Sequence, residues 1–114
     1  MIDKASIPVA CGLPDDRLRA RMREIESGIG PRIAGVRELE DGYELQFSAQ
    51  GDIVEALGRF IAFERQCCPF LDFGLRVRAG GGPVTLTLSG TAEAKTFLGS
   101  AIEQWRVRPG CSCC

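Results

Sequence analysis

The chain contains no histidine at all. This absence excludes zinc sites that mix cysteine and histidine ligands, and it excludes any nucleophile that relies on a histidine base. No stretch approaches the ~20 consecutive apolar residues that a transmembrane helix requires. The net charge of -1 provides no basic excess to hold a phosphate backbone. We therefore expect no membrane insertion and no nucleic-acid partner.

The first 13 residues also lack the long apolar run of a secretory signal, and they include Asp3, Lys4 and Pro8. We expect a cytoplasmic protein, in which reducing conditions favour metal binding or thiol chemistry over disulfides. The chain is nevertheless rich in cysteine, with Cys11, Cys67, Cys68, Cys111, Cys113 and Cys114. Adjacent cysteines fit a disulfide framework poorly, because a bridge between neighbours is cramped. A metal site here is expected to consist of thiolates, with or without a carboxylate.

The hydrophobic pattern predicts one α+β domain over residues 1–108 and a flexible cysteine-rich tail over residues 109–114. We expect an antiparallel sheet of four or five strands with three helices on one face, in the order β-α-β-β-α-β-β-α. The expected elements are an edge strand at 5–11, a helix at 14–27, a hairpin at 32–48, a helix at 52–67, strands at 72–78 and 84–89, and a helix from 91 onward.

The first predicted helix has one apolar stripe, formed by Leu18, Met22, Ile25 and Ile29. Arginines and glutamates, Glu26 among them, fill the rest of this helix. We expect them to form a solvated face, and binding of an anion by the arginines is the alternative.

The most informative stretch is the adjacent pair Cys67 and Cys68, followed by Pro69. Pro69 biases Cys68 toward an extended backbone, so the helix should end at about Cys67 and the sulfurs should lie where the chain enters the sheet. Buried cysteines often act as small hydrophobic residues, which is the structural alternative. Neighbouring side chains at a helix end point in different directions, so core packing explains one of them more easily than both. The pair predicts a site for a soft metal or metalloid.

Glu64 lies three and four residues before these cysteines, on the apolar face of the same predicted helix. A carboxylate on a buried face is costly unless it has a partner. Beside thiols it could accept a thiol proton, orient a ligand or join the coordination sphere of a metal. An ion pair with an arginine from another element is the structural alternative.

The remaining cysteines flank the domain. Cys11 precedes the first predicted helix, whose dipole would stabilise a thiolate, so Cys11 is a candidate third ligand; a buried cysteine at a strand end is the alternative. The tail holds Cys111, Cys113 and Cys114. Extended, the six residues after Arg108 could reach ~20 Å. We expect the tail to capture an ion for the folded site.

Residues 64–70, Glu-Arg-Gln-Cys-Cys-Pro-Phe, together with Ala-Cys-Gly-Leu at 10–13 and weaker matches out to residue 98, resemble a group of small uncharacterised bacterial proteins associated with heavy-metal and mercury resistance. The resemblance offers no established activity, and it implies Cys11, Glu64, Cys67 and Cys68 as the site positions. The tail lies outside this resemblance. Cys113-Cys114 separately resembles the tail of mercuric reductase, which passes Hg(II) between thiol pairs.

Three functions remain open. The first is a protein that binds Hg(II), Cu(I), Zn(II) or As(III) through cysteine thiolates and transfers the ion to a metal-accepting protein. The second is an enzyme, either of organomercurial-lyase type with Glu64 as the catalytic proton donor or a thiol-disulfide oxidoreductase. The third is a small interaction module whose cysteines only pack.

Overall fold

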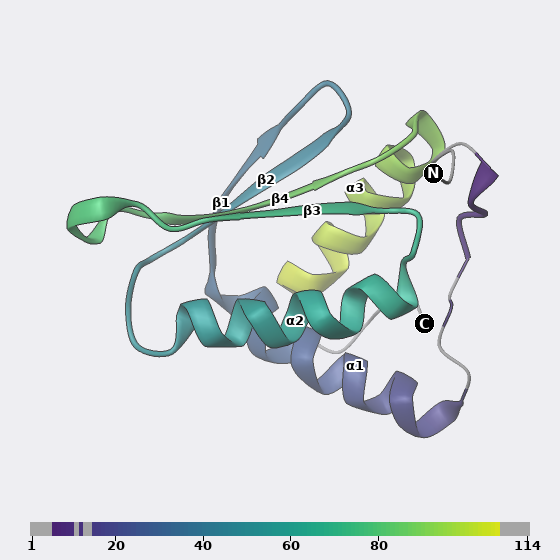
Figure 1. Ribbon diagram of the computed structural model, residues 1–114, viewed down its shortest axis with the longest axis horizontal. Coiled ribbons are helices and arrows are strands. Elements are labelled where there is room, and N and C mark those ends of the chain that lie inside the picture. Colours follow the sequence, from purple (N-terminus) through teal and green to yellow (C-terminus); the bar gives the residue numbers. More distant parts are fainter. Residues whose placement is uncertain (1–5, 11, 13–14, 108–114) are drawn as a thin grey trace.

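The computed structural model describes residues 6–10, 12 and 15–107. Within them the chain forms three α-helices, a four-stranded antiparallel sheet and two short 3-10 helices (Figure 1). The elements are α1 (Asp16–Ile29), η2 (Gly30–Arg32), β1 (Ile33–Glu38), β2 (Gly42–Phe47), α2 (Ile53–Cys67), β3 (Asp72–Arg76), η3 (Ala79–Gly81), β4 (Val84–Ser89) and α3 (Ala92–Val107). The α+β class and the antiparallel sheet confirm the sequence prediction.

The sheet has the strand order β1-β2-β4-β3, so two hairpins meet along β2 and β4. Leu45 pairs with Leu86, and the same face of the sheet buries Phe47 and Leu88. Side chains alternate between the two faces of a strand, so the intervening residues, such as Glu44, lie on the opposite face. One face of the sheet is therefore apolar and is available to the helices.

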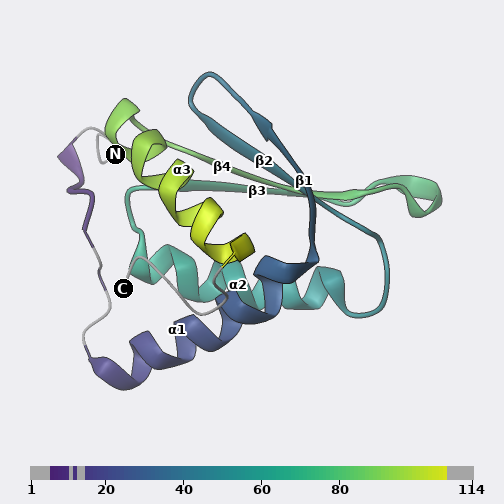
Figure 2. The same cartoon turned by 180° about the vertical axis from the view of Figure 1, so that it is seen from behind.

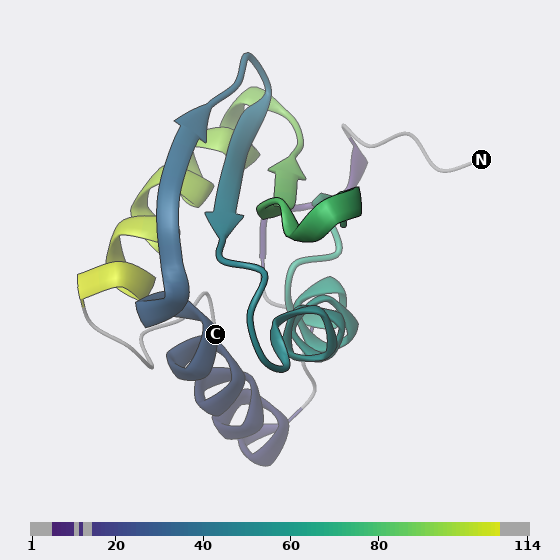
Figure 3. The ribbon, with the colours of Figure 1, turned by 90° about the vertical axis from the view of Figure 1, so that its left-hand side faces the viewer.

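The helices cover this apolar face. α3 contacts β2 and β4, and α2 contacts β3 and β4, whereas α1 packs mainly on α2. Figures 1 and 2 show α1 alongside α2 and farther from the strands, and Figure 3 views α2 nearly end-on with α1 beside it. Phe60 of α2 and Trp105 of α3 meet edge to face, with ring centroids 5.5 Å apart. The apolar core thus lies between the sheet and the helices α2 and α3, and α1 packs on the outside of α2.

α1 is fixed at both ends. The Asp15 side chain caps its first turn by accepting the Leu18 N–H at 2.9 Å. At its other end, Gly30 approaches α3 so closely that a Cβ there would collide with the carbonyl oxygen of Trp105. This close approach holds the last turns of α1 in a defined position.

Two expected strands differ from the structure. Residues 6–10 form no strand; the Ala10 N–H donates to the Pro8 carbonyl at 3.0 Å in a local turn instead. Pro8 has no N–H for a ladder, which explains why this segment adds no strand. β3 ends at Arg76, and Val77 beyond it is 57% exposed, so that strand is shorter than predicted. No helix in the described part of the chain is long and apolar enough to cross a membrane.

Candidate metal site at the end of helix α2

The candidate site is built where α2 ends. Pro69 disfavours a helical backbone at the residue before it, and Cys68 leaves the helix with φ -120° and ψ 70°. The Cys68 N–H still donates to the Glu64 carbonyl at 2.6 Å, and the Leu71 N–H donates to the Cys68 carbonyl at 3.1 Å. These two bonds hold both cysteines at the junction between helix and sheet, as the sequence predicted.

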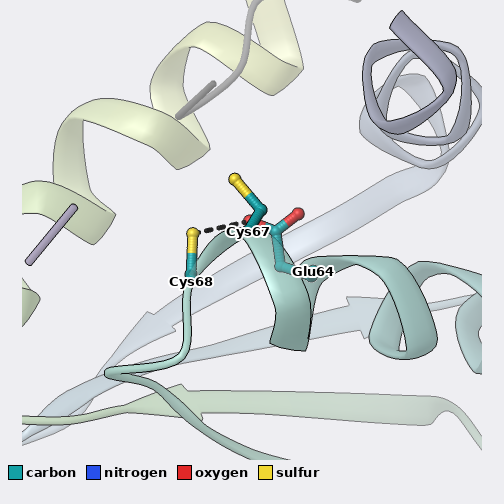
Figure 4. A group of neighbouring side chains, drawn as sticks. All are labelled: Glu64, Cys67 and Cys68. Atoms are coloured by element: carbon teal, nitrogen blue, oxygen red, sulfur yellow. Dashed lines mark hydrogen bonds between the residues drawn. The ribbon is translucent and has the colours of Figure 1, made fainter. Parts of the chain in front are cut away.

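Glu64, Cys67 and Cys68 come together there. One ligand atom from each residue, a carboxylate oxygen and two sulfurs, lies within 4.8 Å of the other two. In Figure 4 the three side chains project from the same end of α2. The Cys68 thiol donates to Glu64 Oε1 at 3.1 Å. All three residues are completely buried, and the predicted neighbourhood of a carboxylate and two cysteine sulfurs is present in the fold.

The two cysteines differ in oxidation state. Cys67 is disulfide-bonded, whereas Cys68 carries a thiol. The sequence had predicted thiols rather than disulfides, and Cys67 departs from that prediction; the bridge does not join the adjacent cysteines, because Cys68 carries a thiol. Ligation of a metal by the Cys67 sulfur therefore requires prior reduction.

The segment before α1 also reaches this point. The Gly12 N–H donates to the Cys67 carbonyl at 2.9 Å. A Cβ at residue 12 would collide with the Gln66 carbonyl oxygen, so the close approach depends on glycine. Cys11, Cys111, Cys113 and Cys114 lie outside the described residues, and their roles as ligands stay predictions.

Burial controls the protonation of the site. Burial raises the pKa of Glu64 above its ordinary value, and the influence of Glu26 and the hydrogen bond from the Cys68 thiol offset part of that shift. The pKa of Cys68 is raised far above the ordinary thiol value, first by burial and then by the charge and hydrogen bond of Glu64 and the charge of Glu26. Cys68 is consequently a protonated thiol at neutral pH, and an ion that binds it must displace that proton.

Glu26 of α1 is the member of the site that the sequence analysis missed. It was expected on the solvated face of its helix, yet it is completely buried, and its carboxyl influences the pKa of Glu64. Glu26 follows Met22 by four residues and precedes Ile29 by three, and both are buried. That spacing places Glu26 on the apolar stripe, and it was the available signal.

Burial disfavours the charged form of a carboxyl, and the raised pKa of Glu64 follows from it. Chemically, the site combines sulfur donors, a carboxyl oxygen and a proton held close to a thiol.

No protein-family model, curated protein or solved structure matches this chain.

Proposed function

We propose that the protein binds a soft metal or metalloid ion at the end of α2, through the sulfurs of Cys67 and Cys68 with the Glu64 carboxylate beside them. The observation that carries this proposal is the convergence of these three ligand atoms within 4.8 Å in a buried setting. Thiolates select soft and borderline ions, so the expected ligands are Hg(II), Cu(I), Zn(II) or As(III).

Coordination number distinguishes these ions. Two sulfurs suffice for linear Hg(II) or Cu(I), and a carboxylate oxygen adds a third donor for Zn(II). Trigonal As(III) needs three sulfurs, and the third would come from Cys11 or the tail. The Cys68 proton must leave in every case, and Glu64 Oε1, at 3.1 Å, is the nearest described acceptor.

Reduction of Cys67 precedes binding in this proposal. A thiol or phosphine reductant supplies two electrons, the disulfide opens, and both of its sulfurs become thiols. The raised pKa of Cys68 argues against thiol-disulfide exchange as the function, because the attacking species in that chemistry is a thiolate.

The tail cysteines Cys111, Cys113 and Cys114 would capture the ion and exchange it with the folded site, from which a metal-accepting protein would take it. A cytoplasmic role in heavy-metal resistance, with mercury as the first candidate, accords with the resemblance of residues 64–70 to proteins of that context.

One observation favours a second candidate, cleavage of an organomercurial. Burial raises the pKa of Glu64 and so favours a protonated carboxyl beside the sulfurs that would hold mercury. In this reaction the carbon–mercury bond breaks, the carbon takes the proton from the Glu64 carboxyl, and Hg(II) remains on the thiolates. Release of the hydrocarbon from an alkylmercury compound would identify this activity, and Glu64→Gln should abolish it while Hg(II) binding persists.

The proposal is tested by titrating the reduced protein with each of the four ions and following thiolate-to-metal charge-transfer absorption. Three proteins are compared: the wild type, a variant lacking residues 109–114, and that truncated variant with Cys67→Ser and Cys68→Ser. We expect tight binding in the first two and its loss in the third.

Circular dichroism of the serine variant provides the control for folding. Equal binding by the truncated protein with and without the two cysteines would contradict the proposal. Failure of the truncated protein to bind any of the four ions would do the same, and would favour cysteines that serve only in packing.

A further inference from the structure

We propose that the outer edge of β3 is a dimer interface, at which two copies of this chain pair their β3 strands antiparallel and so join two four-stranded sheets into one. Three features of this edge support a second copy of the chain as its partner. They are the position of β3 in the sheet, the apolar side chains exposed beside it, and the order of the charges along the strand.

β3 is an edge strand. In the order β1-β2-β4-β3 it pairs with β4 on one side, and no strand of the described residues pairs with its other side. An edge strand presents backbone N–H and C=O groups along its outer side as a template for another strand. The ladder between β3 and β4 runs from Asp72 to Arg76 without a shift of register. The outer side of β3 is therefore regular enough to accept a partner strand.

β1, the strand at the opposite edge, is protected against such pairing. Its register with β2 shifts between Ile33 and Gly35, and an irregularity of this kind bends an edge strand away from a potential partner. Arg37 of β1 also forms an ion pair with Glu44 of β2 at 2.9 Å. The two edges of the sheet are thus not equivalent, and β3 is the one suited to pairing.

Apolar side chains are exposed beside the edge that β3 forms. Among the described residues the exposed large apolar side chains are Val54, Leu75 and Val77, at 43%, 36% and 57%. Leu75 is paired with the buried Leu86, so it lies on the helix-covered face of the sheet. β3 runs antiparallel to α2, so its end lies at the same end of the molecule as Val54 at the start of that helix (Figure 1). Apolar side chains gathered at a sheet edge are typical of a surface that a partner covers.

The sequence of β3 is complementary to itself in an antiparallel ladder. With Gly74 on the two-fold axis, Asp72 lies opposite Arg76 of the second copy, and Phe73 lies opposite Leu75 of that copy. Opposite charges directly across a ladder stabilise it, whereas like charges there oppose it. A two-fold interface forms each of these contacts twice. The charges of β3 therefore favour a second copy of the chain over an unrelated strand.

The oligomeric state of the full-length protein tests this interface. Sedimentation velocity is measured over a wide range of concentration, with a thiol reductant present so that no disulfide joins two copies. We expect a reversible equilibrium between monomer and dimer. Arg76→Asp should raise the dissociation constant at least ~10-fold, because it places like charges opposite each other at two symmetric positions. Arg37→Asp on β1 is the matched control and should leave the constant close to that of the wild type.

Two further variants examine the pairing itself. Asp72→Arg combined with Arg76→Asp exchanges the two charges and should restore the dimer that Arg76→Asp alone weakens. Leu75→Lys should abolish the dimer, because lysine on an edge strand opposes pairing. Thermal unfolding of each variant at low concentration excludes loss of the fold as the cause.

Amide hydrogen exchange locates the interface on the molecule. Raising the concentration above the dissociation constant should slow exchange at alternate residues of β3 and leave β1 unchanged. A protein that stays monomeric at every concentration would overturn the proposed interface. So would a dimer that Leu75→Lys and Arg76→Asp weaken no more than Arg37→Asp does, or one that the exchange of charges fails to restore.

Discussion

The Cys68 thiol donates a hydrogen bond to Glu64 Oε1 across 3.1 Å, and neither side chain is exposed to solvent. This bond joins the last turn of α2 to the first residue beyond it. Because the two groups are buried together, the protonation of one affects the other, and both bear on how the protein responds to pH, to reduction and to metal ions.

Stability should fall as pH rises above 4.5, the ordinary pKa of a glutamate. The folded pKa of Glu64 lies above its ordinary value of 4.5, so the folded protein binds this proton more tightly than the unfolded chain does. The contribution is complete below the unfolded pKa and is lost as pH rises through the folded one. Urea unfolding across this range should show a decrease in the wild type that is smaller in Glu64→Gln. A wild type with no decrease relative to Glu64→Gln would contradict this account.

A second decrease is expected at alkaline pH. Burial raises the pKa of Cys68 above the ordinary value of 9.0, so the unfolded chain loses this proton first. Stability from this group is present below pH 9.0 and declines above it. Comparing wild type with Cys68→Ser in the same unfolding experiment isolates the effect. The two proteins should diverge only at alkaline pH, and parallel curves there would be the opposing result.

The two buried glutamates should show strongly non-additive effects on stability. Removing Glu26 or Glu64 alone by substitution with methionine leaves the other carboxyl buried without the interaction between the two, at a cost of ~1–3 kcal/mol. Replacing both removes that penalty, so the double variant should be close to wild type or more stable. A double-mutant cycle from urea unfolding measures the coupling. Additive losses would mean that the two carboxyls do not interact.

Binding at the folded site should depend on reduction, because Cys67 is disulfide-bonded. The full-length protein and its Cys67→Ser variant are compared before and after treatment with a phosphine reductant, so that the contribution of Cys67 is separated from that of the other thiols. We expect Hg(II) affinity to rise by at least ~10-fold on reduction, since a second thiolate ligand becomes available. Equal affinity in the oxidised and reduced forms would show that the Cys67 sulfur is not a ligand.

The packing of the end of α1 against α3 can be tested by substituting each of two nearby glycines, Gly30 and Gly28, with alanine. Gly30→Ala should destabilise the protein by ~1–3 kcal/mol, because its Cβ collides with the Trp105 carbonyl oxygen. Gly28→Ala is the matched control: nothing lies within 4 Å of a Cβ there, and alanine should stabilise the helix by ~1 kcal/mol. Thermal unfolding measures both, and equal effects of the two changes would contradict the packing described.

Much of this fold follows from local sequence signals. The dipeptide Asp41-Gly42, a strong turn signal, lies between the two strands of the hairpin predicted at 32–48, and Pro69 marked the end of α2; both act through the backbone of their immediate neighbours. The segment at residues 6–10 could not be placed in the same way. Its few apolar residues suggest a strand, but whether a strand pairs depends on a neighbour that the sequence does not reveal.

The site was predictable where its members lie on one helix. Glu64 and the two cysteines are three and four residues apart, so helical geometry alone brings them together. The pairing of Glu26 with Glu64 depends on how α1 packs against α2, which no local pattern specifies. The apolar stripe of α1 did contain the signal that Glu26 is buried, but the charge of the residue made a solvated position the natural interpretation.

The most direct test of the central claim is the X-ray absorption spectrum of the ion bound to the reduced protein without residues 109–114. The ion that binds most tightly in the titrations is used. We expect a first shell that contains two sulfur atoms, at ~2.3 Å if the ion is zinc, and that loses them in the variant with Cys67→Ser and Cys68→Ser. A first shell of oxygen and nitrogen alone, or an identical sulfur shell in that variant, would contradict binding at the end of α2.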